Sequence, residues 1–158
     1  MDLEFLFEAI DGSGLASFVK AHGGLFAMVQ TVHLSAMAIL GGMMLVTDLR
    51  LLNVLLRSVP ADDIVEGTRN WINYGLVTMI LSGVYLSMAV ATKLYHNYFF
   101  WSKMAALGMG CLFLYAIKLP LLTRGVDQVG VWTVRAVAMA SLMIWFTVAA
   151  SGRWIGFS

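Results

Sequence analysis

The stretch LFAMVQTVHLSAMAILGGMMLV, from Leu25 to Val46, is long and apolar enough to cross a lipid bilayer. A spanning helix needs roughly 20 predominantly apolar residues. Within this stretch the only ionisable side chain is His33. The fold is therefore predicted to begin with a transmembrane helix over residues 25–46 that carries an imidazole inside the hydrocarbon.

Three further stretches have the same character, at residues 72–91, 99–119 and 131–150, and Pro120 and Gly125 mark the end of the third. The whole chain of 158 residues is 60% hydrophobic and only 12% charged, whereas soluble domains carry about 25% charged residues. The prediction is an all-α integral membrane protein. Residues 1–158 would form a single membrane domain, a bundle of four transmembrane helices in contact with the lipid bilayer.

The segment before the first span, residues 1–23, mixes apolar residues with acids and predicts short surface helices. MDLEFLFEAI has the pattern of an amphipathic helix lying on the membrane. The DGSG turn separates it from a second short helix that contains Phe18 and ends at Gly23 and Gly24. Between the first two spans, RSVPADDIVEGTRN is expected to be a polar loop, with room for a short helix after Pro60.

Four spans place both termini on one face of the membrane. Basic residues are more numerous on the opposite face, so that face is predicted to be cytoplasmic and the termini periplasmic. The six basic residues of the cytoplasmic face are Arg50, Arg57, Arg69, Lys118, Arg124 and Arg135, against Lys20, Lys93, Lys103 and Arg153 on the other. The chain lacks a basic stripe, which argues against nucleic acid as a partner.

His33 is the first candidate for chemistry, because it would lie roughly 12 Å below the outer end of its helix at about 1.5 Å per residue. Ionisable residues at such depth face the bundle interior or a cavity. A neutral imidazole can ligate a metal or a haem iron. It can equally donate a hydrogen bond to a carbonyl or a serine of a neighbouring helix, and both interpretations stay open.

Met37 lies one turn below His33, and a thioether can ligate haem iron or Cu(I). Methionine more often fills gaps in apolar packing. Lys103 and Arg153 would lie near the outer face, where both could hold the propionates of a haem. Lipid phosphates are the alternative partners of these two cations.

His22 and His96 are the second candidate site, both expected at the outer face. Two imidazoles with a third ligand could hold copper or zinc. The alternative is a pair of interfacial histidines within a belt of aromatic residues. The sequence therefore keeps an outer copper site as a further hypothesis.

Three charged residues lie near the inner ends of the predicted spans and need either a partner or contact with the headgroups: Asp48, Lys118 and Arg135. Asp48 is expected to pair with Arg135 and so to fix the first helix to the fourth. Lys118, and likewise Lys103 at the other end of its span, is expected to extend toward the headgroups. Motifs of soluble enzymes such as G-x-S-x-G, the P-loop, H-E-x-x-H and C-x-x-C do not occur.

Three stretches together resemble a known family: TVHLSAMAILGGMMLVTDLRLL (31–52), HNYFFWSKM (96–104) and SLMIWFTVAASGRWIGF (141–157). They resemble the uncharacterised bacterial four-helix membrane proteins catalogued as domain of unknown function 6644. More distantly, the arrangement is similar to copper-resistance D and cytochrome b561-like membrane proteins, in which histidines of a four-helix bundle hold b-type haem. That resemblance implies that His33 is a haem-binding histidine and that Lys103 and Arg153 occupy the family's other polar positions. Unlike those proteins, this chain has one histidine inside a span.

The function predicted from these residues is binding of haem b in the bacterial inner membrane, with an electron-transfer or redox role and His33 as axial ligand. Whether the protein is an enzyme is left open, a cytochrome-like redox subunit being one form it could take. Two alternatives remain: a non-catalytic assembly subunit, and a copper-binding protein that uses His22, His96 and methionines. A homo-oligomer or membership of a larger membrane complex is expected, because glycine-rich helix faces leave surface to bury.

Overall fold

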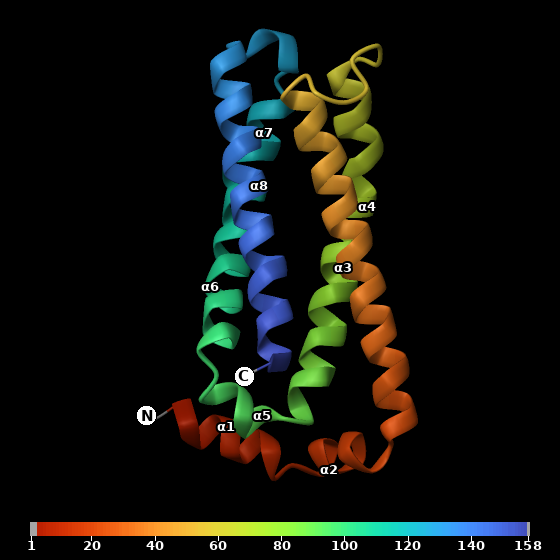
Figure 1. The fold of residues 1–158 in the computed structure, drawn as a ribbon, viewed down its shortest axis with the longest axis vertical. Helices are drawn as coiled ribbons and strands as arrows, with labels where there is room; N and C mark the ends of the chain where they lie inside the picture. The colour runs from red at the N-terminus through yellow and green to blue at the C-terminus, as the bar shows by residue number, and fades with distance from the viewer. Residues whose placement is uncertain (1–2, 158) are drawn as a thin grey trace.

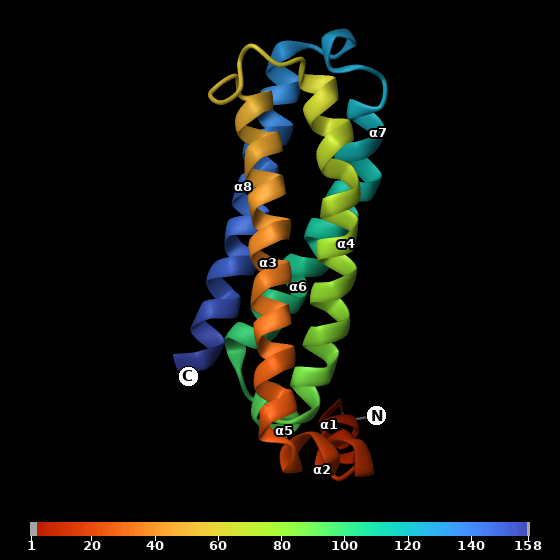
Figure 2. The ribbon, with the colours of Figure 1, turned by 90° about the vertical axis from the view of Figure 1, so that its right-hand side faces the viewer.

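The computed structural model describes residues 3–157, and within that range every regular element is a helix. Four long helical stretches stand side by side (Figures 1 and 2). They are α3 (Gly23–Leu51), α4 (Ala61–Met88), the continuous stretch from α6 (Tyr98–Phe113) to α7 (Leu119–Leu122), and α8 (Val131–Trp154). Met1, Asp2 and Ser158, which the predicted domain includes, lie outside the described residues.

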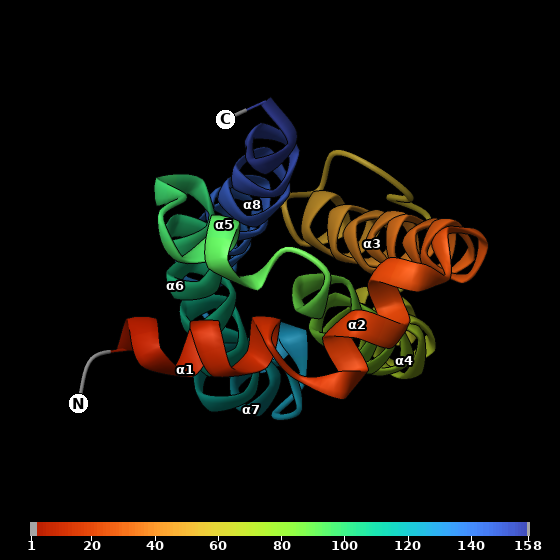
Figure 3. The same cartoon turned by 90° about the horizontal axis from the view of Figure 1, so that it is seen from below.

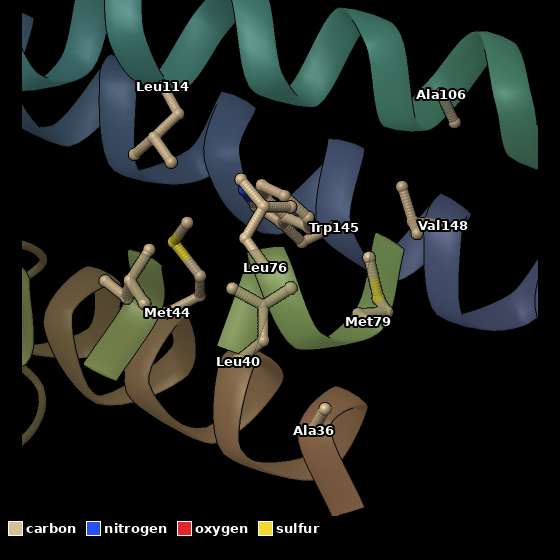
Figure 4. Packing of buried hydrophobic residues seen from close by; sticks show 10 residues of the cluster. Ala36, Leu40, Met44, Leu76, Met79, Ala106, Leu114, Trp145 and Val148 are labelled. Atoms are coloured by element: carbon tan, nitrogen blue, oxygen red, sulfur yellow. The ribbon is translucent and has the colours of Figure 1, made fainter. Parts of the chain in front are cut away.

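The bundle is built from two closely packed helix pairs, α3 with α4 and α6 with α8, which meet along α3 and α8. Glycines allow the close approach within each pair. A Cβ added to Gly75 of α4 would lie 3.2 Å from Leu40 Cβ, and one added to Gly110 of α6 would lie 3.2 Å from Ile144 Cγ2. The main core fills the space between the pairs (Figure 4) and consists of Ala36, Leu40, Met44, Ile72, Leu76, Met79, Ala106, Leu114, Trp145 and Val148.

The outer surfaces of the four long helices are apolar. All four are long and apolar enough to cross a membrane, yet only 17% to 33% of the residues in the most apolar window of each are buried in the protein. The remaining apolar side chains need lipid around them, since soluble proteins rarely expose such continuous apolar surface. The fold is an all-α, four-helix membrane bundle, as the sequence predicts.

Three short helices lie across one end of the bundle, where both chain ends are also found (Figures 1 and 3). They are α1 (Leu3–Asp11), α2 (Gly14–Ala21) and α5 (Ala91–Tyr95). The Ser13 side chain caps α2 by accepting a hydrogen bond from the Ala16 amide. The Phe7 ring of α1 packs at 5.5 to 6.1 Å from the rings of Tyr95, Phe100 and Trp101. The two short helices expected before the first span are thus present.

Two boundaries before the second span differ from the sequence prediction. Gly23 and Gly24 begin α3 instead of ending α2, which stops at Ala21. α4 begins at Ala61, directly after Pro60, so the expected polar loop is in large part helix. Asp62 and Asp63 occupy the first turn of α4, where negative charge complements the helix dipole. These polar turns extend the helix beyond the apolar stretch.

The third span also continues further than expected, through Pro120 to Leu122. A π-helical turn, η1 (Leu114–Lys118), separates α6 from α7 and changes the hydrogen-bond register just before the proline. Pro120 then lies in the first turn of α7, where its missing N–H is tolerated. Short 3₁₀ turns follow at η2 (Val126–Gln128) and η3 (Ile155–Phe157).

Candidate functional site

His33 extends from α3 toward α4 and is half-buried between the two helices. Its Nδ1 lies 2.9 Å from Ser82 Oγ. The ring lies so close to α4 that a Cβ added to Gly83 would be 3.2 Å from His33 Cε1. A serine and a glycine adjacent on α4 thus provide the hydrogen-bond partner and the space for the imidazole.

The hydrogen bonds of Ser82 determine which nitrogen of a neutral His33 carries the proton. The Ser82 hydroxyl donates to the main-chain oxygen of Thr78 at 2.6 Å, so it must accept a hydrogen bond from His33 Nδ1–H. The lone pair of the imidazole is then on Nε2, and the main-chain oxygen of Met79 is a further hydrogen-bond partner of the ring. Metal-ligating histidines are usually oriented in this way, with the second ring nitrogen donating to a neighbouring group.

Lys103 of α6 is a charged residue close to His33. It is half-buried, lies close enough to His33 to interact with it electrostatically, and packs its Cε and Nζ on Gly152 of α8. Its ammonium group forms no ion pair within the described part of the chain. The Lys103 side chain therefore lies against α8 within its own helix pair, and the expected extension to the headgroups stays a prediction.

Tyr85 is a residue that the sequence analysis missed. It follows Ser82 by three residues and so lies on the same face of α4. Its hydroxyl is buried and has no hydrogen-bond partner among residues 3–157. A buried polar group without a partner costs free energy, so it marks a place where a bound molecule could satisfy it. The signal in the sequence is the spacing of Ser82 and Tyr85 on one helix face.

Met37 and Arg153 are placed differently from Lys103. Met37 packs against the main core, one turn from His33 on the same helix. Two residues on one helix face lie side by side, so they cannot bind opposite faces of one iron. Arg153 is exposed, with its guanidinium over the Phe157 ring at 4.4 Å, and no hydrogen bond or ion pair between described residues links it to His33.

His22 and His96, the two histidines expected at the outer face, each contact other groups of the protein. His22 forms the junction between α2 and α3, and its Nδ1 donates to the Phe18 main-chain oxygen at 2.9 Å. His96 Nδ1 lies 3.2 Å from the Thr92 oxygen, and its Nε2 lies 3.6 Å from Glu4 Oε1. No group of three or more His, Cys, Asp or Glu side chains within residues 3–157 is arranged to hold a metal ion.

A buried ion pair lies at the other end of the bundle. Lys118 Nζ donates to Asp48 Oδ1 at 2.6 Å and to Ser141 Oγ at 3.0 Å, and the two charged side chains are 2% and 0% exposed. It links α3, the π-helical turn η1 and α8. The predictions for both residues are wrong: Asp48 pairs with Lys118 and not with Arg135, whose guanidinium lies over the Trp132 ring at 5.7 Å.

The π-helical turn η1 explains why Lys118 pairs with Asp48 inside the bundle instead of extending toward the headgroups. Lys118 is the last residue of the turn, and the altered register directs it into the bundle instead of toward the headgroups. The sequence contains one signal for the pair, since Asp48 and Lys118 have opposite charges and both lie near the inner end of a span. Nothing in the sequence pattern predicts the turn itself.

A cleft of about 440 Å³ opens between α3 and α8 next to this ion pair. Its lining is almost entirely apolar, with Gly41, Met44 and Leu45 on one side and Met143, Phe146 and Ala149 on the other. Asp48 and Trp145 also line it, and each has a buried polar atom without a partner in the described structure, Asp48 Oδ2 and Trp145 Nε1. Asp48 lies about 22 Å further along α3 than His33, so the cleft and the histidine are separate sites.

A comparison with protein families finds one whose model matches residues 6–158, described as a family of unknown function (DUF6644). No curated protein and no solved structure matches the chain. The match confirms the first resemblance seen in the sequence. It does not extend to copper-resistance D or cytochrome b561-like proteins.

Proposed function

The chain belongs to the family of unknown function DUF6644, and from its site we propose that it is a membrane protein that binds b-type haem and transfers electrons. His33 is the proposed axial ligand. The observation that carries the proposal is the pair of hydrogen bonds from His33 Nδ1 to Ser82 and from Ser82 to Thr78, which leave the Nε2 lone pair available. When bound, haem would supply one-electron chemistry at its iron.

The residues around His33 have the properties that such a group requires. Ser82 holds the imidazole in one tautomer and one orientation. Lys103, a cation inside the bundle that forms no ion pair with the described residues, is the proposed contact for a propionate, and the Tyr85 hydroxyl is a hydrogen-bond donor on the same face of α4 as Ser82. Because His33 and Lys103 belong to different helix pairs, a molecule that contacts both would bridge the pairs.

The donor set contains one histidine within a spanning helix. A second axial ligand would therefore come from a methionine or from another subunit, or the iron would be five-coordinate. Met37, which packs against the main core one turn from His33, would line the proposed site beside His33. Arg153 can contact a propionate only if η3 changes conformation when haem binds, because its guanidinium lies over the Phe157 ring of that turn.

The test is the visible absorption spectrum of the protein purified from cells supplied with a haem precursor. The proposal predicts a Soret band and a b-type pyridine haemochrome, both absent from His33→Ala. Ser82→Ala keeps the ligand but removes its orienting partner, so haem affinity falls by about 10- to 100-fold. His22→Ala is the matched control and keeps the full spectrum. A colourless wild-type protein refutes the proposal.

A second candidate, a structural or assembly subunit, is favoured by one observation. The hydrogen bond from His33 to Ser82 is by itself a sufficient reason for an imidazole between α3 and α4. In that case His33→Ala lowers the unfolding temperature while neither protein has a visible spectrum. The spectrum thus separates the two candidates.

Orientation in the bacterial inner membrane, with periplasmic termini, is part of the proposal. Since Lys118 and Lys103 are drawn into the bundle, they no longer count as loop charges. Five basic residues remain on one face (Arg50, Arg57, Arg69, Arg124 and Arg135) and three on the other (Lys20, Lys93 and Arg153). The excess of basic residues therefore stays on the face that the sequence predicts to be cytoplasmic. Reporter fusions to the loop at residues 52–60 and to the C-terminus test this orientation.

The partners are proposed to be copies of the same chain or other subunits of a membrane complex. Exposed apolar residues along all four long helices leave surface for such contacts as well as for lipid. Light scattering of the protein in a defined detergent measures the number of chains in each particle.

A further inference from the structure

The wall of the cleft between α3 and α8 is almost entirely apolar, but two of its residues each carry a buried polar atom. One of these atoms is a hydrogen-bond acceptor and the other is a donor. Asp48 Oδ2 is an acceptor and Trp145 Nε1 is a donor, and neither atom has a close hydrogen-bond partner in the part of the chain that the structure describes, although the Ser141 hydroxyl also interacts with the Asp48 carboxylate. Both residues line the same cleft. Figure 4 shows Trp145 in the core between the helix pairs, with Met44 of α3 beside it.

The position of the cleft determines where a ligand would come from. Its rim includes Leu45, Met143 and Phe146, which are exposed on the apolar outer surfaces of α3 and α8. These surfaces face lipid, so a molecule enters sideways from the bilayer and must be lipid-soluble. The volume of about 440 Å³ falls within the range of about 300–1,000 Å³ typical of small-molecule sites.

The charges beside the cleft restrict the head group of that molecule. Lys118 and Asp48 already neutralise each other at 2.6 Å, so a charged head group would add an uncompensated charge in the membrane. A neutral group is required that donates to Asp48 Oδ2 and accepts from Trp145 Nε1. A hydroxyl group is the smallest neutral group that does both.

We propose that the cleft between α3 and α8 binds a neutral, lipid-soluble molecule through a hydroxyl head group that satisfies Asp48 Oδ2 and Trp145 Nε1. Both polar atoms are buried beneath the cleft wall. Met44, a flexible side chain one turn from Asp48 on the cleft wall, is buried with its Sδ 3.7 Å from Lys118 Nζ and is the side chain that must move for a head group to reach these atoms. The site is independent of the proposed haem site, which lies in the outer half of the bundle.

Two kinds of lipid carry this chemistry, a monoacylglycerol and a phenol with an alkyl chain. The experiment uses the full chain in phosphatidylcholine nanodiscs and a monoacylglycerol with a photoreactive group in its acyl chain. Mass spectrometry locates the crosslinks, and the competitors are unlabelled monoacylglycerol, its di-O-methyl ether, unlabelled alkylphenol and its O-methyl ether. The hydroxyl compound that competes at the lower concentration identifies the source.

Crosslinks are expected on the residues of α3 and α8 that line the cleft. The fully methylated compounds, which have no hydroxyl to donate to Asp48, should compete about 2- to 13-fold less well than their hydroxyl parents, the value of one hydrogen bond. Trp145→Phe should weaken binding by about the same factor. Gly41→Leu should abolish the crosslinks, because an added Cβ at Gly41 meets no protein atom and the larger side chain fills the cleft.

Gly42→Leu is the matched control, since Gly42 also has open space beside it but does not line the cleft. Both variants are checked for an unchanged unfolding temperature, so that a lost crosslink reports the filled cleft. Crosslinks spread over all lipid-facing helices overturn the proposal. So do equal competition by a hydroxyl compound and its ether, and crosslinking of Gly41→Leu at the wild-type level.

Discussion

Replacing Lys118 with methionine would leave the Asp48 carboxylate without its charged partner in the interior of the bundle. In the native protein Asp48 Oδ1 accepts from Lys118 Nζ at 2.6 Å, while Oδ2 has no partner among residues 3–157. Removing one member of a buried ion pair costs about 3–5 kcal/mol, because the other charge stays buried and uncompensated. At about 2–4 °C per kcal/mol for a chain of this size, the unfolding temperature should fall by about 6–20 °C.

The double variant Asp48→Leu/Lys118→Met tests the reason for this loss. It removes both charges and fills their space with apolar groups, so it should unfold near the wild-type temperature or above it. The measurement can use Cys111, the single cysteine of the chain, which is partly buried against the main core. A thiol-reactive fluorogenic dye labels it as the bundle opens on heating.

Lys20→Met is the matched control. Lys20 and Asp11 form an ion pair of similar length, 3.0 Å, but their side chains are 43% and 32% exposed. Exposed pairs contribute about 0–1 kcal/mol, so this variant should unfold close to the wild-type temperature. If Lys118→Met is as stable as Lys20→Met, or if the double variant is less stable than Lys118→Met, the account of the buried pair is wrong.

Three further variants test the helix contacts and boundaries by the same unfolding measurement. Gly75→Ala should destabilise by about 1–3 kcal/mol because its Cβ would meet Leu40 at 3.2 Å, whereas Gly67→Ala, which meets no atom, should be neutral or stabilising by up to about 1 kcal/mol; equal effects would contradict the α3–α4 packing. Asn97→Ala removes the cap that accepts from the amides at the start of α6 and should cost about 1 kcal/mol, so an unchanged unfolding temperature would argue against that helix start. Gly125→Ala places a side chain at φ +92° and should cost more than about 1 kcal/mol; a stable variant would show that this turn has another conformation.

The four spans could be predicted from the sequence because the length of an apolar stretch is set by the thickness of the bilayer. The helix ends could not, because polar residues that follow or precede such a stretch are free to continue the helix outside the lipid. α4 shows this most clearly, since its first turns carry Asp62 and Asp63 and are still helical. Its beginning is determined by Pro60 and the helix dipole, and apolar length gives no information on either.

Of the candidate site, the sequence predicts that His33 is inside the membrane and that Lys103 lies near the outer face, but it does not predict that the two interact. The partner Ser82 was not identified, because serine is common in spanning helices and its contact with α3 depends on the rotation of α4. The pairing of Asp48 with Lys118 was missed for a related reason. Lys118 lies at the end of a π-helical turn, and one extra residue in a turn rotates every side chain that follows.

The central claim, that the imidazole of residue 33 can ligate a haem iron, is tested most directly by chemical rescue. His33→Gly is purified in haem-supplemented detergent, and its absorption spectrum is recorded as free imidazole is added. The account predicts that the variant lacks the wild-type Soret band and that imidazole, entering the space beside Ser82 and Gly83, restores it in a saturable way. A wild-type protein without a Soret band, or a variant whose spectrum matches the wild type before imidazole is added, would contradict the claim.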